Sequence, residues 1–600
     1  MSAIDAPTAT APTECVARRW NDAAAVAFIL LSVSLIYGAR LNLLPLVGEE
    51  TRWATGAREM LDSGDWIVPR QQGQVFPERP PMTMWGMAVV GSLRGSVDPI
   101  AVRLPSVIAV VLTSLLIYMY ARVLLSQTAA IGAALIYATF GQVLQIGRLG
   151  ESEAAFALFV SASLLVWHLG YVRGWPRLAV WSSGFAFAAL AALVKGPQAP
   201  VYFVAITTVY LIVQRDWRYL FCWQSVAGAG VFVAIIATWQ LPFYRATDWS
   251  SVIATWAGLA GDRIRLSGVL SHAISYPVET FVCLLPWSPL LFVLVRRGTR
   301  DLLADKQPIV TYLLVAIIVA YPTVWLAAGA RGRYFMPLYP LVAVLIGFLI
   351  ERCSTAKLGT SQRRAWNLFL VLWAIAIGAG GLVLGIAGLL PGDLAKSLHQ
   401  PRSFCLMFAA IAASAAYILS VAFRRPTRFA PLSAVLATVT IAGFGVGGIL
   451  MNVNESRWND PTSEVEYVRS RIPADTTLFS LTEIEHRFAY YYHTPVVELP
   501  WPQSVSDMPA DVEYFCFMRH GKDTADSRMA GRGRIIYYTS GRLPFAWEEL
   551  AEVCVDRQPD AKFPAYVVLG RVLRPLRAEL SDATKPRGTT ARKPSLSQRK

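Results

Sequence analysis

The chain has 600 residues, of which 54% are hydrophobic, and its mean hydropathy is +0.43. Soluble chains of this length are less hydrophobic, and here the apolar residues form runs of about twenty, the length that crosses a bilayer. We therefore predict a polytopic membrane protein. The net charge of +15 does not indicate nucleic-acid binding, because the basic residues lie between apolar runs or in the C-terminal tail. The seven cysteines form no C-x-x-C pair, which excludes a zinc ribbon.

Residues 1–22 are polar and lack a cleavable signal pattern, so we expect a cytoplasmic N-terminal segment and a retained first span. The membrane domain is predicted to cover residues 23–450 with thirteen spans, at 23–44, 102–124, 128–147, 154–172, 178–194, 198–213, 219–243, 276–296, 308–327, 333–350, 366–390, 403–423 and 430–450. Basic clusters fall on one side of these spans, which the positive-inside rule makes cytoplasmic. The apolar run 82–93 would reverse every later loop if it crossed the bilayer. We expect it to be a short helix at the outer interface.

This topology leaves a long outer loop at 47–101, far longer than a simple connection between two helices requires. The other segments expected on the outer side are 147–153, 195–197, 244–275 and 329–333. Glycine runs inside the apolar spans favour helix packing over a phosphate loop, because no strand precedes them and no GK[ST] follows. We therefore expect no nucleotide cofactor.

After residue 451 the composition becomes that of a soluble domain. A small α/β domain is predicted on the outer side at 451–575, with helices near 459–471 and 544–555 and strands near 476–481, 488–493, 512–518, 534–539 and 565–569. Cys516 and Cys554 form either a disulfide or two unpaired thiols. The tail 576–600 is basic and polar, which predicts disorder, with contact to anionic lipid headgroups as the alternative.

Acidic residues on the outer side form two groups, Glu49-Glu50 and Glu151/Glu153. Paired carboxylates suit general-base work on an acceptor hydroxyl or amine. The alternative is that they are interfacial charges neutralised by nearby arginines. Basic residues on the outer side are unexpected, because the positive-inside rule places most of them in cytoplasmic loops. They indicate a site for a lipid-linked phosphate, which arginine binds with a planar fork of donors. They are Arg79, Lys195, Arg265, Arg331 and Arg333; the alternative for each is a side chain that reaches the headgroup level.

Several motifs in order resemble one known family. They are GEETRWATGAREMLDSGDWIVPRQQGQVFPERPPMTMW at 48–85, RLPS at 103–106, GRLGESE at 147–153, LVKGP at 193–197, LLPW at 284–287 and RYFMPLYP at 333–340. This series resembles the membrane glycosyltransferases of the GT-C fold that use polyprenyl-phosphate sugars, the group with the lipid A aminoarabinose transferases and protein O-mannosyltransferases. The resemblance covers roughly the first 350 residues. The spans and the outer C-terminal domain are similar to the aminoarabinose branch.

Carried over to this sequence, the resemblance implies that Glu49 is the catalytic carboxylate and Glu153 the second acid. Both are Glu where the family usually has Asp, and the extra methylene moves the carboxylate by about a bond length. Glu50, Arg52 and Trp53 would support the site. The tryptophans of this loop are expected to stack on sugar or prenyl groups or, alternatively, to anchor the interface.

The resemblance also implies a phosphate site and a metal site. The donor phosphate would meet Arg79, Lys195, Arg265, Arg333 and Tyr334. Glu78 would hold a divalent cation together with Asp262, or alternatively His272. Carboxylate ligands favour Mg or Mn over Zn.

The function implied is transfer of a sugar from a polyprenyl-phosphate donor to an envelope acceptor such as lipid A, another glycolipid or a glycan, with inversion. Membrane lipids would be further partners. The site would face outward from a bacterial inner membrane, with the C-terminal domain extracytoplasmic. Alternatives are a protein O-mannosyltransferase, a flippase for lipid-linked sugars, or a non-catalytic relative. A transporter is expected to place polar residues near the bilayer midplane, whereas these charges cluster at one face.

Overall fold

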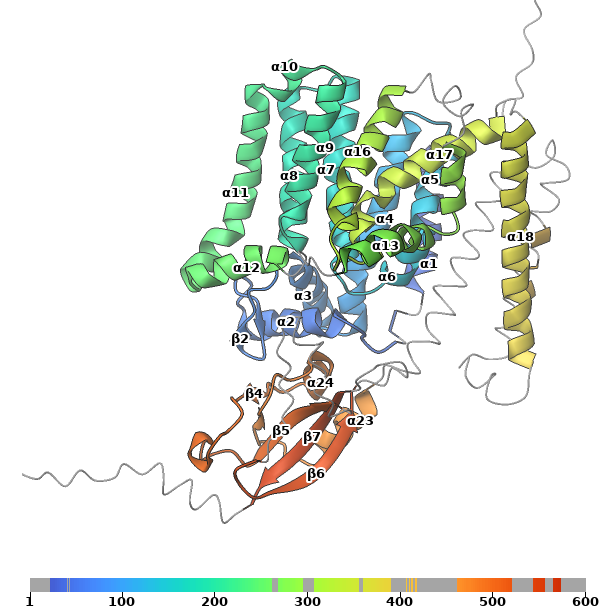
Figure 1. Cartoon of the computed structure of the whole chain (residues 1–600). Helices are drawn as coiled ribbons and strands as arrows, with labels where there is room; N and C mark the ends of the chain where they lie inside the picture. The colour runs from blue at the N-terminus through green and yellow to red at the C-terminus, as the bar shows by residue number, and fades with distance from the viewer. Residues whose placement is uncertain are drawn as a thin grey trace, which may run out of the picture.

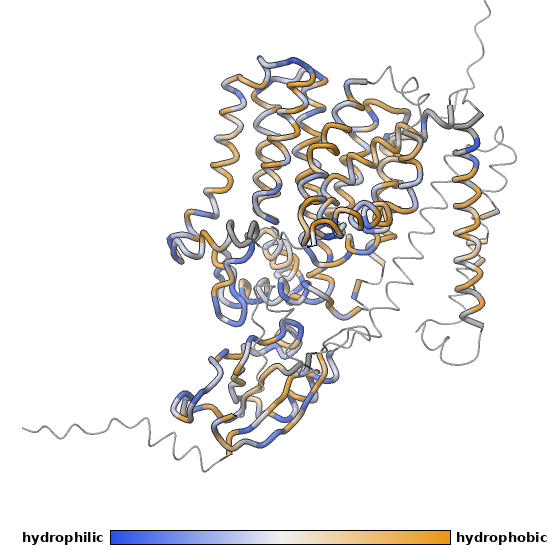
Figure 2. The backbone as a smooth tube through the Cα atoms, viewed as in Figure 1, coloured by the Kyte–Doolittle hydropathy of each residue, from blue (hydrophilic) through white to orange (hydrophobic). Residues whose placement is uncertain are grey.

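The computed structural model describes residues 22–261 except 40 and 43, together with 268–294, 307–355, 360–389, scattered positions between 406 and 417, 461–520, 543–555 and 565–573. Figure 1 shows three layers in this part of the chain. A helical bundle forms the first, a layer with α2, α3 and a small hairpin lies against one end of it, and a sheet domain packs on that layer. In Figure 2 the helices of the bundle are largely hydrophobic and the layer beneath them is more polar.

Six stretches of the described chain are long and apolar enough to cross a bilayer. They are α4 (Pro99–Arg122), α7 (Glu153–Arg173), α8 (Arg177–Lys195), α10 with α11 (Trp217–Leu220 and Trp223–Ala246), α16 (Gln307–Trp325) and η3 with α17 (Gly332–Leu338 and Tyr339–Thr355). Shorter apolar helices are α1 (Asp22–Gly38), α5 (Gln127–Ala138), α9 (Gln198–Val213) and part of α18 (Thr360–Leu389). The chain is thus a mostly helical multi-pass membrane protein.

Small residues and local caps determine how these helices start and pack. Asp98 precedes α4 and accepts a hydrogen bond from the Ala101 amide at 2.8 Å, and Pro99 occupies the first helical position, where no amide donor is needed. A Cβ on Gly228 of α11 would lie 2.9 Å from the backbone of Trp181 in α8. Glycine at this position therefore allows the two helices to approach closely.

Three predicted segments differ from the structure. The span expected at 128–147 is two helices, α5 and α6 (Gly141–Ile146), because the Gly141 amide bonds the Leu285 carbonyl at 2.7 Å instead of continuing α5. The span expected at 276–296 is α13 (Val269–Cys283), η1 (Ser288–Leu290) and α14 (Leu291–Leu294), since Pro286 and Pro289 lack amide donors. The loop expected at 244–275 contains α12 (Trp249–Gly261). The spans expected at 403–423 and 430–450 lie largely or wholly outside the described residues.

The layer below the bundle is built from the long outer loop. Its elements are α2 (Glu50–Ser63), β1 (Arg70–Gln71), β2 (Gln74–Val75) and α3 (Met82–Arg94). Helix α3 is the short helix expected at 82–93, and it buries Met84, Met87 and Ala88 against α2 and α4. Gly64 ends α2 at φ 72°, a left-handed conformation that a glycine adopts without strain.

The sheet domain has the strand order β4-β3-β5-β7-β6. The strands are β3 (Leu478–Ser480), β4 (Val497–Glu498), β5 (Tyr514–His520), β6 (Trp547–Cys554) and β7 (Ala565–Val572), and the helices are α23 (Thr462–Arg469), α24 (His486–Tyr492) and η5 (Val505–Asp507). Strand β3 pairs in parallel with β4 and β5, whereas β7 pairs antiparallel with β5 and β6.

Two predictions for this domain were wrong. The run 488–493 is helix α24 rather than a strand, because the Glu485 side chain caps it by accepting the amides of Arg487 and Phe488. The run 544–555 is largely strand β6 rather than a helix, because it pairs along β7. Strand β7 also separates Cys516 from Cys554, so the disulfide considered above is not formed. The strand expected at 534–539 lies outside the described residues.

Helix α24 attaches the sheet domain to the layer formed by the outer loop (Figure 1). The Tyr491 hydroxyl accepts a hydrogen bond from the Leu46 amide at 2.7 Å, and the Tyr490 hydroxyl donates one to the Val97 carbonyl at 2.8 Å. Arg58 of α2 bonds the Tyr490 carbonyl and lies over its ring. These contacts fix the domain against the side of the outer-loop layer that faces away from the helical bundle.

Candidate active site

The buried carboxylate of Glu50 joins three segments at the start of α2. Arg103 of α4 donates two hydrogen bonds to it, Nε to Oε1 and Nη2 to Oε2, each at 2.8 Å. The amides of Val47 and Gly150 donate two more, at 2.8 and 2.7 Å. Both charged side chains are fully buried, and a buried ion pair of this kind is stable only when its remaining polar atoms are satisfied. Glu50 is therefore an anchor for the site.

Arg103 meets that condition with further hydrogen bonds. Its two terminal nitrogens also donate to the carbonyls of Leu41, Leu44 and Pro45, at 2.7–3.0 Å. The segment between the first helix and α2 is thereby tied to α4. Glu49 lies two residues after Val47, so its position depends on Arg103.

Glu49 itself points away from this anchor. Its side chain is 40% exposed, and its Oε2 lies 3.4 Å from Nη1 of Arg52. The same Arg52 nitrogen lies 3.6 Å from Oε2 of Glu78, which is also exposed. Arg52 thus links the predicted catalytic acid to the predicted metal ligand. An exposed carboxylate is accessible to an acceptor group, as a general base must be.

A second cluster joins the remaining acids to two cations. Arg333 of η3 donates from Nη1 to Oε2 of Glu151 at 2.6 Å, and its Nε lies 3.4 Å from Oε1 of Glu153. Lys195, the last residue of α8, donates to the same Glu153 oxygen at 2.6 Å. Glu151, Glu153 and Lys195 are buried, whereas Arg333 is partly exposed. Residues from α7, α8, η3 and the loop before α7 therefore form one network.

The environment of Glu151 disfavours its charged form. Burial, reinforced by the charge of Glu153, raises the pKa of Glu151 to about 8, although Arg333 opposes this rise. The shift therefore favours uptake of a proton by Glu151 rather than by Glu153, which Lys195 and Arg333 both contact.

The cations predicted for the phosphate occupy different environments. Lys195 lies over the ring of Tyr334, with 5.2 Å between Nζ and the ring centroid. Arg79 is half-buried and within electrostatic reach of Lys195, and Arg333 is likewise within reach of Glu49. The structure therefore brings together Glu49, Arg52, Arg79, Glu153, Lys195 and Arg333. Arg265 lies outside the described residues.

The predicted metal ligands are only partly described. Asp262 lies outside the described residues. His272 faces the Val324 carbonyl at 3.3 Å and packs on Tyr276. Within the described ranges, no three His, Cys, Asp or Glu side chains are grouped to hold a metal ion. Trp53, predicted as a supporting residue, is buried in the core between α2 and α3 with its ring edge-on to Phe76.

Comparison with known proteins gives the same family as the motifs. Residues 78–241 match the family described as dolichyl-phosphate-mannose-protein mannosyltransferase. The undecaprenyl phosphate-alpha-4-amino-4-deoxy-L-arabinose arabinosyl transferase of Pseudomonas aeruginosa is 27% identical over 394 residues, 63% of this chain and 67% of that protein. The protein of the same name from Edwardsiella ictaluri is 29% identical over 378 residues, 61% of this chain and 65% of that protein. The match thus spans about two thirds of these relatives.

A solved structure extends the similarity to almost the whole chain. The crystal structure of ArnT from Cupriavidus metallidurans bound to undecaprenyl phosphate matches with a TM-score of 0.65 at 18% identity, and covers 92% of this chain and 98% of that one. The chain thus has the GT-C fold of this membrane protein. The resemblance inferred from the motifs is therefore confirmed.

The main residue of this site that sequence reasoning missed is Arg103. It belongs to the RLPS motif at 103–106, but the motif gave no sign of its partner, because Glu50 is 53 residues away in sequence. Glu151 was included in a pair of acids, yet nothing in the sequence showed that it differs from Glu153. One difference between them is Lys195, which forms an ion pair with Glu153 at 2.6 Å, whereas Glu151 pairs with Arg333.

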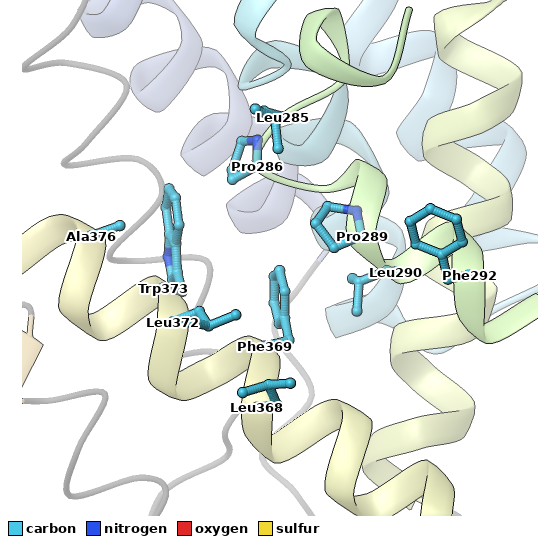
Figure 3. Close-up of a pocket in the computed structure, with 10 residues that line it drawn as sticks. All are labelled: Leu285, Pro286, Pro289, Leu290, Phe292, Leu368, Phe369, Leu372, Trp373 and Ala376. Atoms are coloured by element: carbon cyan, nitrogen blue, oxygen red, sulfur yellow. The ribbon is translucent and has the colours of Figure 1, made fainter. Parts of the chain in front are cut away.

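An apolar cavity lies apart from these charges. It has a volume of about 470 Å³ and lies between α18 and the segment that follows α13 (Figure 3). Leu285, Pro286 and Pro289 form one wall, and Phe369 and Trp373 of α18 form the other. Such a lining suits a hydrocarbon chain and no polar group.

Proposed function

We propose that this protein moves a sugar from a polyprenyl-phosphate donor to an envelope acceptor such as lipid A, another glycolipid or a glycan, on the outer face of the inner membrane. One observation carries the proposal: the exposed carboxylate of Glu49 lies beside Arg52 and within electrostatic reach of Arg333, at one end of an apolar bundle. A base and phosphate-binding cations are thereby adjacent at membrane level. The relatives named as undecaprenyl phosphate-dependent transferases support the same donor class.

In the proposed reaction, Glu49 accepts the proton of an acceptor hydroxyl. The hydroxyl oxygen forms a bond to the anomeric carbon of the donor sugar while the bond from that carbon to the phosphate oxygen breaks. Attack from the face opposite the phosphate inverts the anomeric configuration. Polyprenyl phosphate leaves with the bonding electrons, and Arg79, Lys195, Arg265 and Arg333 stabilise its charge.

Glu153 has a different role in this proposal from Glu49. Its contacts with Lys195 and Arg333 hold both cations in place, so it supports the phosphate site rather than removing the acceptor proton. Tyr334, beneath the Lys195 ammonium, supports the same position. The proton held by Glu151 limits the negative charge that the incoming phosphate meets.

A divalent cation at Glu78 stays part of the proposal as an expectation. Its second ligand would be Asp262 or His272, and Mg or Mn would suit the carboxylates. The described contacts of Glu78 include Arg52, which already places a positive charge beside its carboxylate. For this reason no step of the reaction above depends on a metal.

The proposed orientation places the N-terminus in the cytoplasm and the sheet domain outside, within a topology of thirteen spans. In Figure 1 the helix α10, which connects α9 to α11, lies at the end of the bundle opposite α2 and α3. Arg215 precedes α10 and Arg218 lies within it. Basic loops at that end support a cytoplasmic assignment for it.

Protein O-mannosylation is the second candidate, because the family that matches residues 78–241 is described by that activity. Both candidates use the same donor class and differ in the acceptor. The test is to incubate the purified protein with a panel of polyprenyl-phosphate sugars and, separately, with envelope glycolipid or a Ser/Thr-rich peptide. Release of polyprenyl phosphate only with glycolipid supports the first candidate, and release only with peptide supports the second. No release from any donor would contradict both.

A further inference from the structure

A polar cavity of about 310 Å³ lies between the outer-loop layer and the sheet domain. Its lining residues come from α2, the β1-β2 hairpin and the residues just after it, and from α24, β4 and the residues just before α24; Figure 1 shows where these elements lie. The wall from the outer loop includes Arg52, Gln71, Gln74, Phe76 and Glu78, and the wall from the sheet domain includes Glu483, His486 and Glu498. Neither of the two parts forms this cavity alone.

Hydrogen bonds between and within the two parts hold the walls in place. The Val496 amide donates to Gln72 Oε1 at 2.7 Å, and a ring nitrogen of His486 lies 3.1 Å from the Gly48 carbonyl. Within the walls, the Ile484 amide donates to Glu498 Oε1 at 3.1 Å. These contacts fix the shape of the cavity when the sheet domain packs on the outer-loop layer.

The cavity reaches the proposed base through one residue. Arg52 lines it, and Nη1 of the same guanidinium lies 3.4 Å from Glu49. The Arg52 side chain is nine-tenths buried, and its Nε has no hydrogen-bond partner among the described residues. A buried donor without a partner carries a free-energy cost that a hydrogen-bonding ligand would remove.

The charges of the lining define the ligand. Glu78, Glu483 and Glu498 place three carboxylates around the cavity against the single guanidinium of Arg52. A phosphate would be repelled by this set, whereas hydroxyls and amines would find carboxylate and glutamine acceptors. The ring of Phe76 adds an apolar surface against which a sugar ring can pack.

We propose that this cavity binds a saccharide of the acceptor that carries hydroxyl or amine groups and no phosphate, and so delivers the acceptor hydroxyl toward Glu49. This inference rests on the proposed transferase function and adds the acceptor class. Selection between acceptors then occurs at the boundary with the sheet domain. The donor binds at a different place, where Arg79, Lys195 and Arg333 meet its phosphate.

The kinetic test uses the full-length protein in lipid nanodiscs with Glu483→Arg, because Glu483 is exposed and its replacement leaves the core intact. Its matched control is Glu549→Arg, an exposed glutamate of β6 that does not line the cavity. Loss of an acceptor group and its replacement by a cation should raise KM about tenfold for a glycolipid with an unphosphorylated glucosamine disaccharide headgroup. The KM for the polyprenyl-phosphate donor should not change. Equal acceptor KM in both variants would overturn the proposal.

A binding test separates this inference from the transferase function, because it needs no turnover. Gln74→Cys introduces a thiol on the cavity wall, and its maleimide labelling rate is measured against the unsubstituted chain. A glucosamine disaccharide should slow labelling, the same disaccharide bearing phosphates should not, and Glu483→Arg should remove the protection. Protection without any donor turnover would keep the saccharide site and contradict the transferase function. No protection, or equal protection by the phosphorylated form, would overturn the saccharide site.

Discussion

Glu49 and Glu50 are adjacent in the chain, yet the side chain of Glu49 is 40% exposed and that of Glu50 is fully buried. The backbone turns into α2 between them, which directs Glu50 to Arg103 and leaves Glu49 beside Arg52. The pair therefore divides into an anchor and a reactive group. Removing either carboxylate should stop the reaction, but for different reasons.

Glu49→Gln should lower kcat by about 10²–10⁴-fold, because the amide cannot accept the acceptor proton. The thermal midpoint of unfolding should stay unchanged, since this side chain is 40% exposed and its ion pair with Arg52 spans 3.4 Å. Release of polyprenyl phosphate measures the rate. Glu49→Asp is the matched control, because it keeps a carboxylate at this position, and it should retain part of the activity. Normal turnover by Glu49→Gln would show that the base lies elsewhere.

Glu50→Gln should destabilise the protein by about 3–5 kcal/mol, because it leaves the Arg103 charge buried without its partner. The measurement is the free energy or thermal midpoint of unfolding in detergent, compared with Glu49→Gln. Arg103→Met combined with Glu50→Gln should cost less than the sum of the two single changes, as expected of residues in direct contact. Additive effects would mean that the two side chains do not depend on each other.

Much of this architecture could be predicted from the sequence, because apolar runs and basic clusters are local signals. The order of the motifs predicted the fold class and placed Glu49, Glu153, Lys195 and Arg333 on one face. What failed were features decided by distant contacts. The break between α5 and α6 depends on a hydrogen bond from the Gly141 amide to the Leu285 carbonyl. Residues 128–147 alone do not predict this contact.

The same reason explains the errors in the sheet domain. The aromatic run 488–493 has the composition of a strand, but the cap at Glu485 and the stack of Phe488 on Tyr492, four residues apart, belong to a helix. The contact between Tyr491 and Leu46 joins residues 445 positions apart. The saccharide cavity, formed by such contacts, had no signal in the sequence.

Arg333→Gln should lower kcat/KM for the donor by about 10²–10³-fold, since it removes a cation that would face the leaving phosphate. Arg333→Lys should recover little, because one ammonium cannot bridge Glu151 and Glu153 as the guanidinium does. Arg331→Gln is the control two residues away, with an exposed side chain, and should keep most activity. Equal losses in Arg331→Gln and Arg333→Gln would indicate a general electrostatic effect instead.

Removal of divalent metal tests the expectation at Glu78. If a metal takes part, a chelator should abolish turnover of the unsubstituted protein, added Mg²⁺ or Mn²⁺ should restore it, and Glu78→Ala should need a higher metal concentration. The measurement is polyprenyl phosphate release against free metal concentration. Unchanged activity of Glu78→Ala together with an unchanged response to chelator would remove Glu78 from the metal site.

Stability should fall as pH rises between about 4.5 and 8, because of Glu151. Burial raises its pKa to about 8 in the folded protein, from the ordinary value of a glutamate near 4.5, so in this window the folded state binds more protons than the unfolded state. The folded form therefore loses stability as the pH approaches 8. Glu151→Gln, which resembles the protonated form and cannot ionise, should show a weaker loss of thermal midpoint between pH 5 and 8.

The comparison is made by thermal unfolding of both proteins at matched ionic strength from pH 5 to 9. The two midpoints should be close at pH 5, where Glu151 is protonated, and the Gln variant should be the more stable at pH 9. Arg333 partly offsets this difference, since at high pH its guanidinium pairs with the ionised carboxylate 2.6 Å away. Parallel curves over the whole range would mean that Glu151 titrates normally, and would remove the proton that the proposed phosphate site assigns to it.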